Sequence, residues 1–174
     1  MLNQLKSMDP IIAPGANILI LGSMPGEQSL KRQQYYGNPR NHFWFILDEL
    51  FQTDISTRNY DDKRQFLKDK KIALWDVIAS CERKGSLDSA IRDEKMNDIR
   101  TLLKNYPTIQ WVGLNGTKAY DSFRKYSKNH TLPALPFKKL PSSSPVPGRN
   151  VKTFNEKVES WRELTNYLSM TGEK

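Results

Sequence analysis

Two short segments near the amino terminus carry the side chains best suited to bind and react with a ligand. Residues 22–26 read GSMPG and follow the apolar run of residues 18–21, so we expect a buried strand to end in a tight loop there. Residues 35–44 read YYGNPRNHFW and bring aromatic rings, an arginine and asparagine amides close to that loop. Open α/β sheets place their ligands at the carboxyl ends of strands. The two segments therefore predict a site for a flat, anionic ligand.

Length and composition favour one domain with a polyanionic partner. The 174 residues, 37% of them hydrophobic, suffice for one core and are too few for two ordinary domains, so residues 1–174 are expected to form a single domain. The formal net charge of +8 favours nucleic acid, because cationic side chains placed on phosphates release counterions.

The single cysteine, Cys81, limits the chemistry and the cellular compartment. One thiol excludes an intramolecular disulfide and any cluster or zinc site that needs several thiolates, and it fits a reducing, intracellular location. No stretch approaches the roughly 20 apolar residues of a membrane span. These features predict a soluble, cytoplasmic protein that does not associate with membranes.

Short apolar runs alternate with segments of helical spacing. Strands are expected at 17–21, 71–75, 109–113 and 137–140, and helical segments at 41–51, 86–91, 97–103, 115–126 and 155–168. This alternation predicts the α/β class, as a three-layer α/β/α sandwich around a central, mostly parallel four-stranded sheet. In such a sheet the polar residues after each strand meet at one edge, and these are Ser23, Asp76, Asn115 and serines 142–144.

An ordered series of motifs resembles the uracil-DNA glycosylase superfamily, in particular its hypoxanthine-DNA (deoxyinosine) glycosylase branch, family 6. The series runs GSMPG (22–26), SL (29–30), YY (35–36), PRNHFW (39–44), LWDV (74–77), GSLD (85–88) and LPS (140–142). The resemblance implies a monomeric, monofunctional base excision repair enzyme without metal or cofactor. Such an enzyme flips a deaminated base, hypoxanthine or uracil, out of DNA and hydrolyses its N-glycosidic bond.

The resemblance assigns roles to two residues of the second segment. An aromatic residue occupies the matching place in related glycosylases, so Tyr36 is the expected stacking platform; its alternative role is core packing. Asn41 is the expected catalytic residue, with Asn38 as its competitor. The Asn41 amide can hold a water through its oxygen or donate from its nitrogen to the departing base. Its alternative role is to cap the helix that follows.

Asp76 and the first loop complete the expected base site. Asp76 matches a base-reading position in other branches, where it can accept the base N–H or stabilise the sugar cation; it can also simply cap a turn. Several relatives carry Asp or Asn where this chain has Ser23 or Met24, so Ser23 is not expected to act as a nucleophile. The backbone N–H groups of this loop are expected to bind the base carbonyl or a phosphate, with Asn115 nearby.

DNA contacts are expected on both sides of this site. Ser142, Ser143 and Ser144 resemble the loop with which relatives pinch the DNA backbone, although a linker has the same composition, and Val146 or Pro147 is the candidate wedge. Arg40 and Lys118 are candidate phosphate contacts. Further candidates share only their positive charge: Arg83, Lys84 and Arg149.

Two other classes of function remain open at this point. A noncatalytic module on the same fold would bind damaged DNA without releasing a base, and the replacement of an acidic residue by Ser23 favours it. A nucleotide-processing α/β enzyme would have to bind free nucleotide with an affinity equal to its affinity for DNA.

Overall fold

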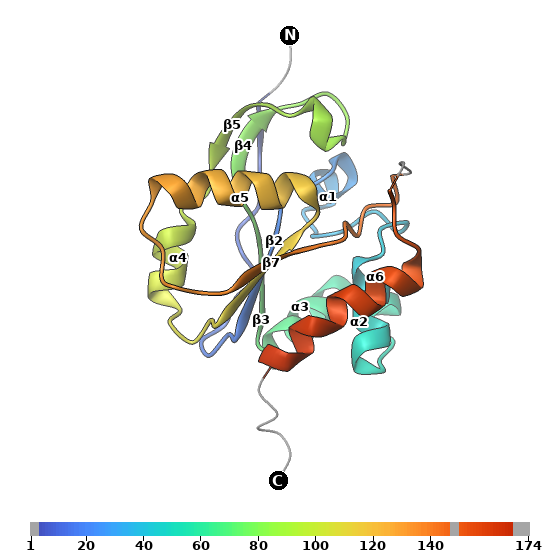
Figure 1. Ribbon diagram of the computed structural model, residues 1–174. Helices are drawn as coiled ribbons and strands as arrows, with labels where there is room; N and C mark the ends of the chain where they lie inside the picture. The colour runs from blue at the N-terminus through green and yellow to red at the C-terminus, as the bar shows by residue number, and fades with distance from the viewer. Residues whose placement is uncertain (1–3, 147–149, 169–174) are drawn as a thin grey trace.

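The computed structural model describes residues 4–146 and 150–168 (Figure 1). Its central sheet is fully parallel and has the strand order β3-β2-β6-β7. The strands are β2 (Ile18–Gly22), β3 (Ile72–Asp76), β6 (Trp111–Asn115) and β7 (Phe137–Leu140). All four predicted strands are therefore present, each within two residues of its predicted bounds.

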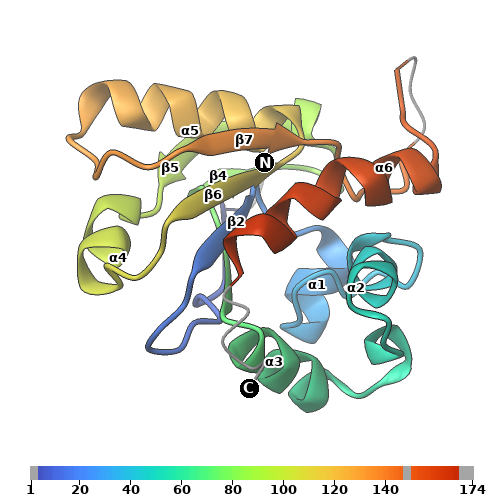
Figure 2. The ribbon, with the colours of Figure 1, turned by 60° about the horizontal axis from the view of Figure 1, so that its bottom comes forward.

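Helices cover both faces of this sheet. On one face lie α2 (Phe43–Phe51), α3 (Tyr60–Asp69) and α6 (Phe154–Trp161). On the other lie α4 (Ile99–Asn105) and α5 (Thr117–Asn129), and Figures 1 and 2 show the two helical layers with the sheet between them. The predicted three-layer α/β/α sandwich is confirmed.

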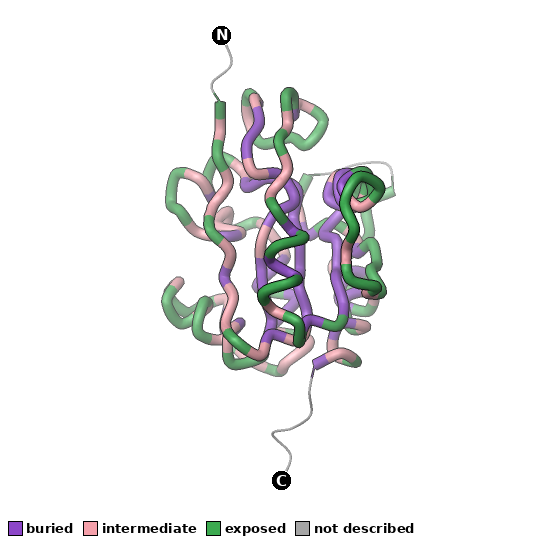
Figure 3. Tube along the Cα trace, turned by 90° about the vertical axis from the view of Figure 1, so that its left-hand side faces the viewer, coloured by how far each residue is buried: buried purple, intermediate pink, exposed green. Residues whose placement is uncertain are grey.

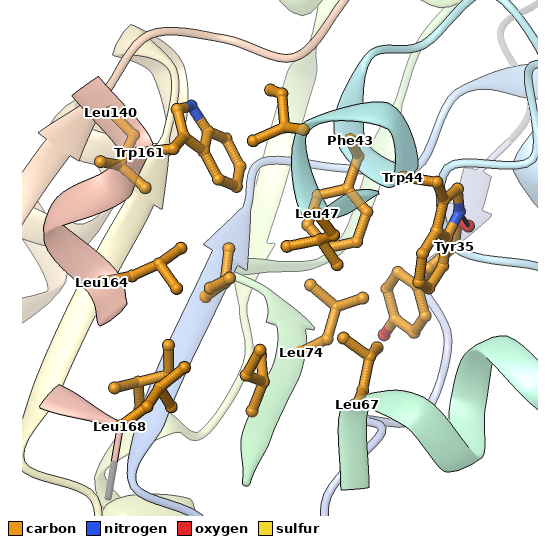
Figure 4. Close-up of a cluster of buried hydrophobic side chains, with 14 of the residues drawn as sticks. Tyr35, Phe43, Trp44, Leu47, Leu67, Leu74, Leu140, Trp161, Leu164 and Leu168 are labelled. Carbon is orange, nitrogen blue, oxygen red and sulfur yellow. Dashed lines mark hydrogen bonds between the residues drawn. The ribbon is translucent and has the colours of Figure 1, made fainter. Parts of the chain in front are cut away.

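Strand β2 shows why the sheet must be covered on both sides. Ile18 and Ile20 are fully buried against the layer of α2, α3 and α6, whereas Leu19 and Leu21 are fully buried against the layer of α4 and α5. Alternate residues of a strand point to opposite faces, so a strand buried on both faces must be continuously apolar. Figure 3 shows the resulting buried interior, and Figure 4 shows Trp161 of α6 facing the side chains of α2.

A second, antiparallel sheet was not expected from the sequence. It has the order β1-β4-β5 and consists of β1 (Gln4–Lys6), β4 (Ile78–Glu82) and β5 (Arg92–Met96). The prediction of a helical segment at 86–91 was wrong, because only one 3-10 turn, η2 (Asp88–Ala90), forms before the chain enters β5. The sparse apolar pattern of this segment does not favour a helix packed on the core. Strand β5 instead makes its backbone hydrogen bonds by pairing with β4.

Other helix bounds also differ from the predictions. Asn115 belongs to β6, and α5 begins only after Gly116. Gly116 has a φ of 95°, a backbone conformation that favours glycine and that turns the chain from the strand into the helix. At the carboxyl end α6 gives way to the 3-10 helix η3 (Arg162–Tyr167). The short helices α1 (Glu27–Arg32) and η1 (Ile55–Thr57) complete the fold. Among residues 4–146 and 150–168, no helix is long and apolar enough to cross a membrane.

Candidate active site

A cleft of about 1240 Å³ opens at the carboxyl ends of the central strands. The first loop, the Tyr36 to Asn41 segment, Asp76, Asn115 and the serine loop all line it. These segments are distant in sequence, and the parallel register brings their strand ends to one edge. The structure therefore brings the predicted strand-end residues together.

The floor of the cleft is formed where β2 and β3 end side by side. Gly22 pairs with Asp76 in the parallel register. A Cβ atom at Gly22 would lie 2.5 Å from Asp76 Oδ1 and 3.1 Å from the Tyr36 hydroxyl. Only glycine therefore lets the carboxylate and the phenol approach the strand this closely.

Asp76 is a buried carboxylate with unused hydrogen-bonding capacity. It is only 4% exposed, and its Oδ2 has no hydrogen-bond partner among the described residues. Burial, followed by the negative charge of Asp88, raises the pKa of Asp76 to about 7, against a smaller opposing effect of Arg83. Such a group changes its charge near neutral pH.

Tyr36 lies half-buried between the core and the cleft. Its backbone is left-handed, with a φ of 54°, and its ring stacks on Phe43 with centroids 4.1 Å apart and an interplanar angle of 18°. Its hydroxyl accepts a hydrogen bond of 2.9 Å from Asn115 Nδ2. Burial and the charge of Asp76 raise the pKa of Tyr36, so the phenol is neutral. Tyr36 thus packs on Phe43 of the core and also lines the cleft, and its role as a stacking platform for a base stays a prediction.

Asn115 anchors the serine loop. Its Oδ1 accepts from the Ser143 backbone N–H, and its Nδ2 donates to the Ser143 hydroxyl, both at 2.9 Å. The Ser143 carbonyl in turn accepts from the His42 backbone N–H at 2.9 Å. The end of β6, the serine loop and the start of α2 therefore form one hydrogen-bonded unit.

Asn41 combines a local structural contact with a free amide nitrogen. Its Oδ1 accepts the Phe43 backbone N–H at 2.9 Å, at the first residue of α2. The alternative prediction that Asn41 is the N-cap residue was wrong, because the helix begins at Phe43 and its N-cap residue is His42. No partner of Asn41 Nδ2 is present in the described part of the chain. Asn38, the competing residue, also lines the cleft and makes the same kind of contact, because its Oδ1 accepts from the Arg40 backbone N–H at 2.9 Å.

Lys157 is a site residue that sequence reasoning missed. Although it is a lysine on α6, it is only 2% exposed, and its Nζ lies 3.1 Å from His42 Nδ1 and 3.3 Å from the Ser144 carbonyl oxygen. Burial lowers the pKa of Lys157; burial and the Lys157 charge lower that of His42. No sequence pattern marks this lysine, because only the packing of α6 against the loop buries it.

The first loop is fixed by contacts from residues 78, 81 and 88, which lie far away in the chain. Ser23 Oγ donates to Asp88 Oδ1 at 2.7 Å, and Met24 is buried beside Ile78 and Cys81. The backbone N–H groups of Met24 and Gly26 have no acceptor among the described residues. These N–H groups can therefore donate hydrogen bonds to an acceptor atom of a ligand.

Arg83 is a structural residue, and its prediction as a phosphate contact was wrong. The side chain is 4% exposed and donates to the carbonyl oxygens of Pro25 at 2.6 Å and Gly85 at 2.8 Å. A guanidinium held in this way links the first loop to the segment that follows β4. It is not available to a phosphate in solution.

The remaining DNA-contact candidates differ in availability. The Ser142 and Ser144 hydroxyls accept from backbone N–H groups two residues further on, which stiffens the loop that presents the exposed Val146. Lys118 lines the cleft but pairs with Glu94 at 2.6 Å. Arg40 is exposed but is not among the residues that line the cleft, and Lys84 is also exposed. Pro147 and Arg149 lie outside the described residues.

Together, the fold and the cleft define an α/β protein whose ligand site lies at the carboxyl edge of a parallel sheet and combines an aromatic ring, amides and a buried carboxylate. A family model of the uracil DNA glycosylase superfamily matches residues 10–165. The chain therefore belongs to the uracil DNA glycosylase superfamily.

Individual relatives agree with this assignment. Two proteins named hypoxanthine DNA glycosylase, from Methanosarcina barkeri and Methanosarcina acetivorans, are each 35% identical to the chain, over 160 and 161 residues. The matches cover 91% of this chain and 96% of each relative. A solution NMR structure of a Methanosarcina acetivorans protein, provisionally named a uracil DNA glycosylase, has a TM-score of 0.78 and 33% identity. This structural match covers 94% of this chain and 99% of the chain in the NMR structure.

Proposed function

We propose that the protein is a monofunctional DNA glycosylase that removes hypoxanthine, and also uracil, from DNA and leaves an abasic site for base excision repair. The observation that carries the proposal is the convergence of Tyr36, Asn41 and the unpartnered carboxylate of Asp76 on one cleft. The names of the relatives from Methanosarcina support hypoxanthine as the base. The net charge of +8 supports a DNA substrate.

The proposed base site reads the feature that deamination creates. Hypoxanthine and uracil carry a ring N–H next to a carbonyl, whereas adenine and cytosine have an unprotonated ring nitrogen at that place. A flipped base stacks on Tyr36, its ring N–H donates to Asp76 Oδ2, and its carbonyl accepts from the free N–H groups of Met24 and Gly26. Adenine and cytosine would leave the buried Asp76 oxygen unpaired, which costs binding energy.

The proposed leaving-group contact comes from Asn41. Its Oδ1 is already bonded to the Phe43 N–H, so the group available to substrate is Nδ2. An amide N–H placed at the departing base stabilises the negative charge that develops as the glycosidic bond breaks. The hydrogen bond from His42 to Ser143 fixes the start of α2 and thereby positions Asn41.

The DNA backbone is proposed to lie over the serine loop. Ser142 and Ser144 present hydroxyls from a stiffened loop, Lys118 and Arg40 supply positive charge, and the exposed Val146 is the wedge that fills the gap left by the flipped base. Ser143 serves as the anchor of this loop, because its side chain is held by Asn115.

The proposal is tested by single-turnover assays with enzyme in excess over labelled duplexes that contain one deoxyinosine or one deoxyuridine. We expect free hypoxanthine or uracil by chromatography and a strand break only after alkali, with no release from an undamaged duplex of the same sequence. Absence of base release at stoichiometric enzyme would contradict the proposal. If tight binding to deoxyinosine DNA persisted in that case, the protein would be a noncatalytic damaged-DNA-binding module.

A further inference from the structure

The Asp88 carboxylate is held at the cleft beside the first loop. Ser23 donates to its Oδ1 at 2.7 Å across 65 residues of sequence, while its Oδ2 has no partner among residues 4–146 and 150–168. Asp88 is exposed and lines the same cleft as Asp76 and Asn41. It therefore has one oxygen tied to the protein and one free for a ligand or a water.

The segment that carries Asp88 is attached firmly. The Arg83 guanidinium bridges the carbonyl oxygens of Pro25 and Gly85, and the Ser86 hydroxyl accepts the Glu27 backbone N–H at 2.9 Å. These contacts join the segment to Pro25 within the first loop and to Glu27 directly after it. Asp88 is thus presented to the cleft by a braced turn.

Asp88 and Asp76 form an unequal carboxylate pair. Gly22 pairs with Asp76 in the sheet register, and the next residue, Ser23, binds Asp88, so the two carboxylates flank the end of β2. Asp76 is 4% exposed and unpartnered at Oδ2, whereas Asp88 is exposed to the solvent of the cleft. Pairs of carboxylates in unlike surroundings divide acid–base work in enzymes that cleave glycosidic bonds.

The proposed reaction still needs a group that holds and deprotonates the attacking water. The first loop offers no carboxylate of its own, the Asn41 oxygen is bonded to the Phe43 N–H, and Asp76 faces the base. Three further carboxylates among the described residues line the cleft and are exposed: Glu27, Asp88 and Asp121. Of these, only Asp88 accepts a side-chain hydrogen bond from the first loop.

We propose that Asp88 is a catalytic residue that binds the hydrolytic water and takes its proton. This inference rests on the proposed function. The water oxygen forms a bond to C1′ as the C1′–N bond breaks, the electron pair of that bond leaves with the base, and the water proton passes to Asp88 and then to solvent. Ser23 is a positioning residue that orients the carboxylate through Oδ1.

The test compares Asp88→Asn with Asp121→Asn in single-turnover cleavage of deoxyinosine DNA. Asparagine keeps an Oδ1 acceptor for Ser23, so the turn is retained, and Asp121 is a matched exposed carboxylate at the rim of the same cleft. We expect Asp88→Asn to lower the rate about 100-fold or more, as loss of a general base does, and Asp121→Asn to leave it within about 2-fold. DNA affinity should be unchanged or tighter in both, since each variant loses one negative charge.

A second readout separates chemistry from structure. Ser23→Ala should lower the maximal rate about 10-fold with unchanged melting temperature. In Asp88→Asn, the part of the pH–rate profile that reports the ionisation of Asp76 should move to lower pH, because the negative charge of Asp88 has been removed. An active wild type with an equally active Asp88→Asn variant, or a variant whose loss lies entirely in DNA affinity or in folding, would overturn this inference alone. An inactive wild type would overturn the proposed function together with it.

Discussion

Asn115 and Ser143 are joined by two hydrogen bonds of 2.9 Å each, in which the amide of one residue pairs with both the backbone N–H and the hydroxyl of the other. Ser143 is 1% exposed, so solvent does not reach these contacts in the folded protein. The same amide also holds the Tyr36 hydroxyl. One side chain at the end of β6 therefore sets both the stacking ring and the loop proposed to contact DNA.

The first prediction concerns this pair. Asn115→Ala leaves the buried Ser143 N–H without an acceptor and should lower the free energy of unfolding by about 1–3 kcal/mol. Asn115→Asp keeps that acceptor and removes the Nδ2 donor to the Tyr36 and Ser143 hydroxyls, and its stability loss should be smaller because each hydroxyl can donate to the carboxylate instead. Urea unfolding measures both, with Asn129→Ala, an exposed asparagine on α5, as the control. Equal stability of the Ala variant and the wild type would contradict the prediction.

The second prediction separates the two contacts of Asn41. Asn41→Ala should remove the hydrogen bond to the Phe43 N–H at the start of α2, worth about 1 kcal/mol of stability, and should also lower the single-turnover rate. Asn41→Asp keeps an oxygen for the Phe43 N–H, so it should retain stability while losing the rate about 100-fold or more. Thermal unfolding and base release are measured on the same samples. If Asn41→Asp were fully active, the free amide nitrogen would have no part in the chemistry.

The third prediction follows from the carboxyl group of Asp76, whose pKa is raised from 3.8 to about 7 by burial and by Asp88. Between these two values the folded state binds more protons than the unfolded state, so the stability should fall as the pH rises from about 4 to about 7. The fall should amount to at least about 1 kcal/mol and should vanish in Asp76→Asn. Urea unfolding at pH 5 and pH 8 checks the sign.

Catalysis should show the opposite trend with pH. Ionised Asp76 can accept the ring N–H of hypoxanthine, so the single-turnover rate should increase with pH through about 7. A wild-type rate that is flat across this range would contradict the proposed base contact of Asp76 and leave the stability prediction unaffected.

The fourth prediction concerns Lys157 and His42. Burial and the Lys157 charge both hold the pKa of His42 below its usual value, so Lys157→Met should raise the His42 pKa. A proton NMR titration resolves this, because the chain has only two histidines and His130 at the end of α5 serves as the reference signal. An unchanged His42 pKa would show that the two side chains do not interact in solution.

The local pattern determined the central sheet and the strand-end site. Residues 18–21 are apolar without interruption, which requires a strand covered on both faces, and polar residues follow each of the four strands. Because parallel strands end at one edge, the convergence of Asp76 and Asn115 on the first loop follows from the order of these elements. The motif series also identified the family, which the comparisons confirm.

Only the tertiary structure decided which polar groups of these residues are already engaged. The hydrogen bond from Ser23 to Asp88 spans 65 residues, Lys157 is buried by contacts with His42 and Ser144, and Arg83 is enclosed between two loops. No local pattern encodes such contacts, because they depend on how the small antiparallel sheet and α6 pack on the central layers. The sequence thus determined which groups reach the cleft, whereas packing and desolvation decided which of them are free to act there.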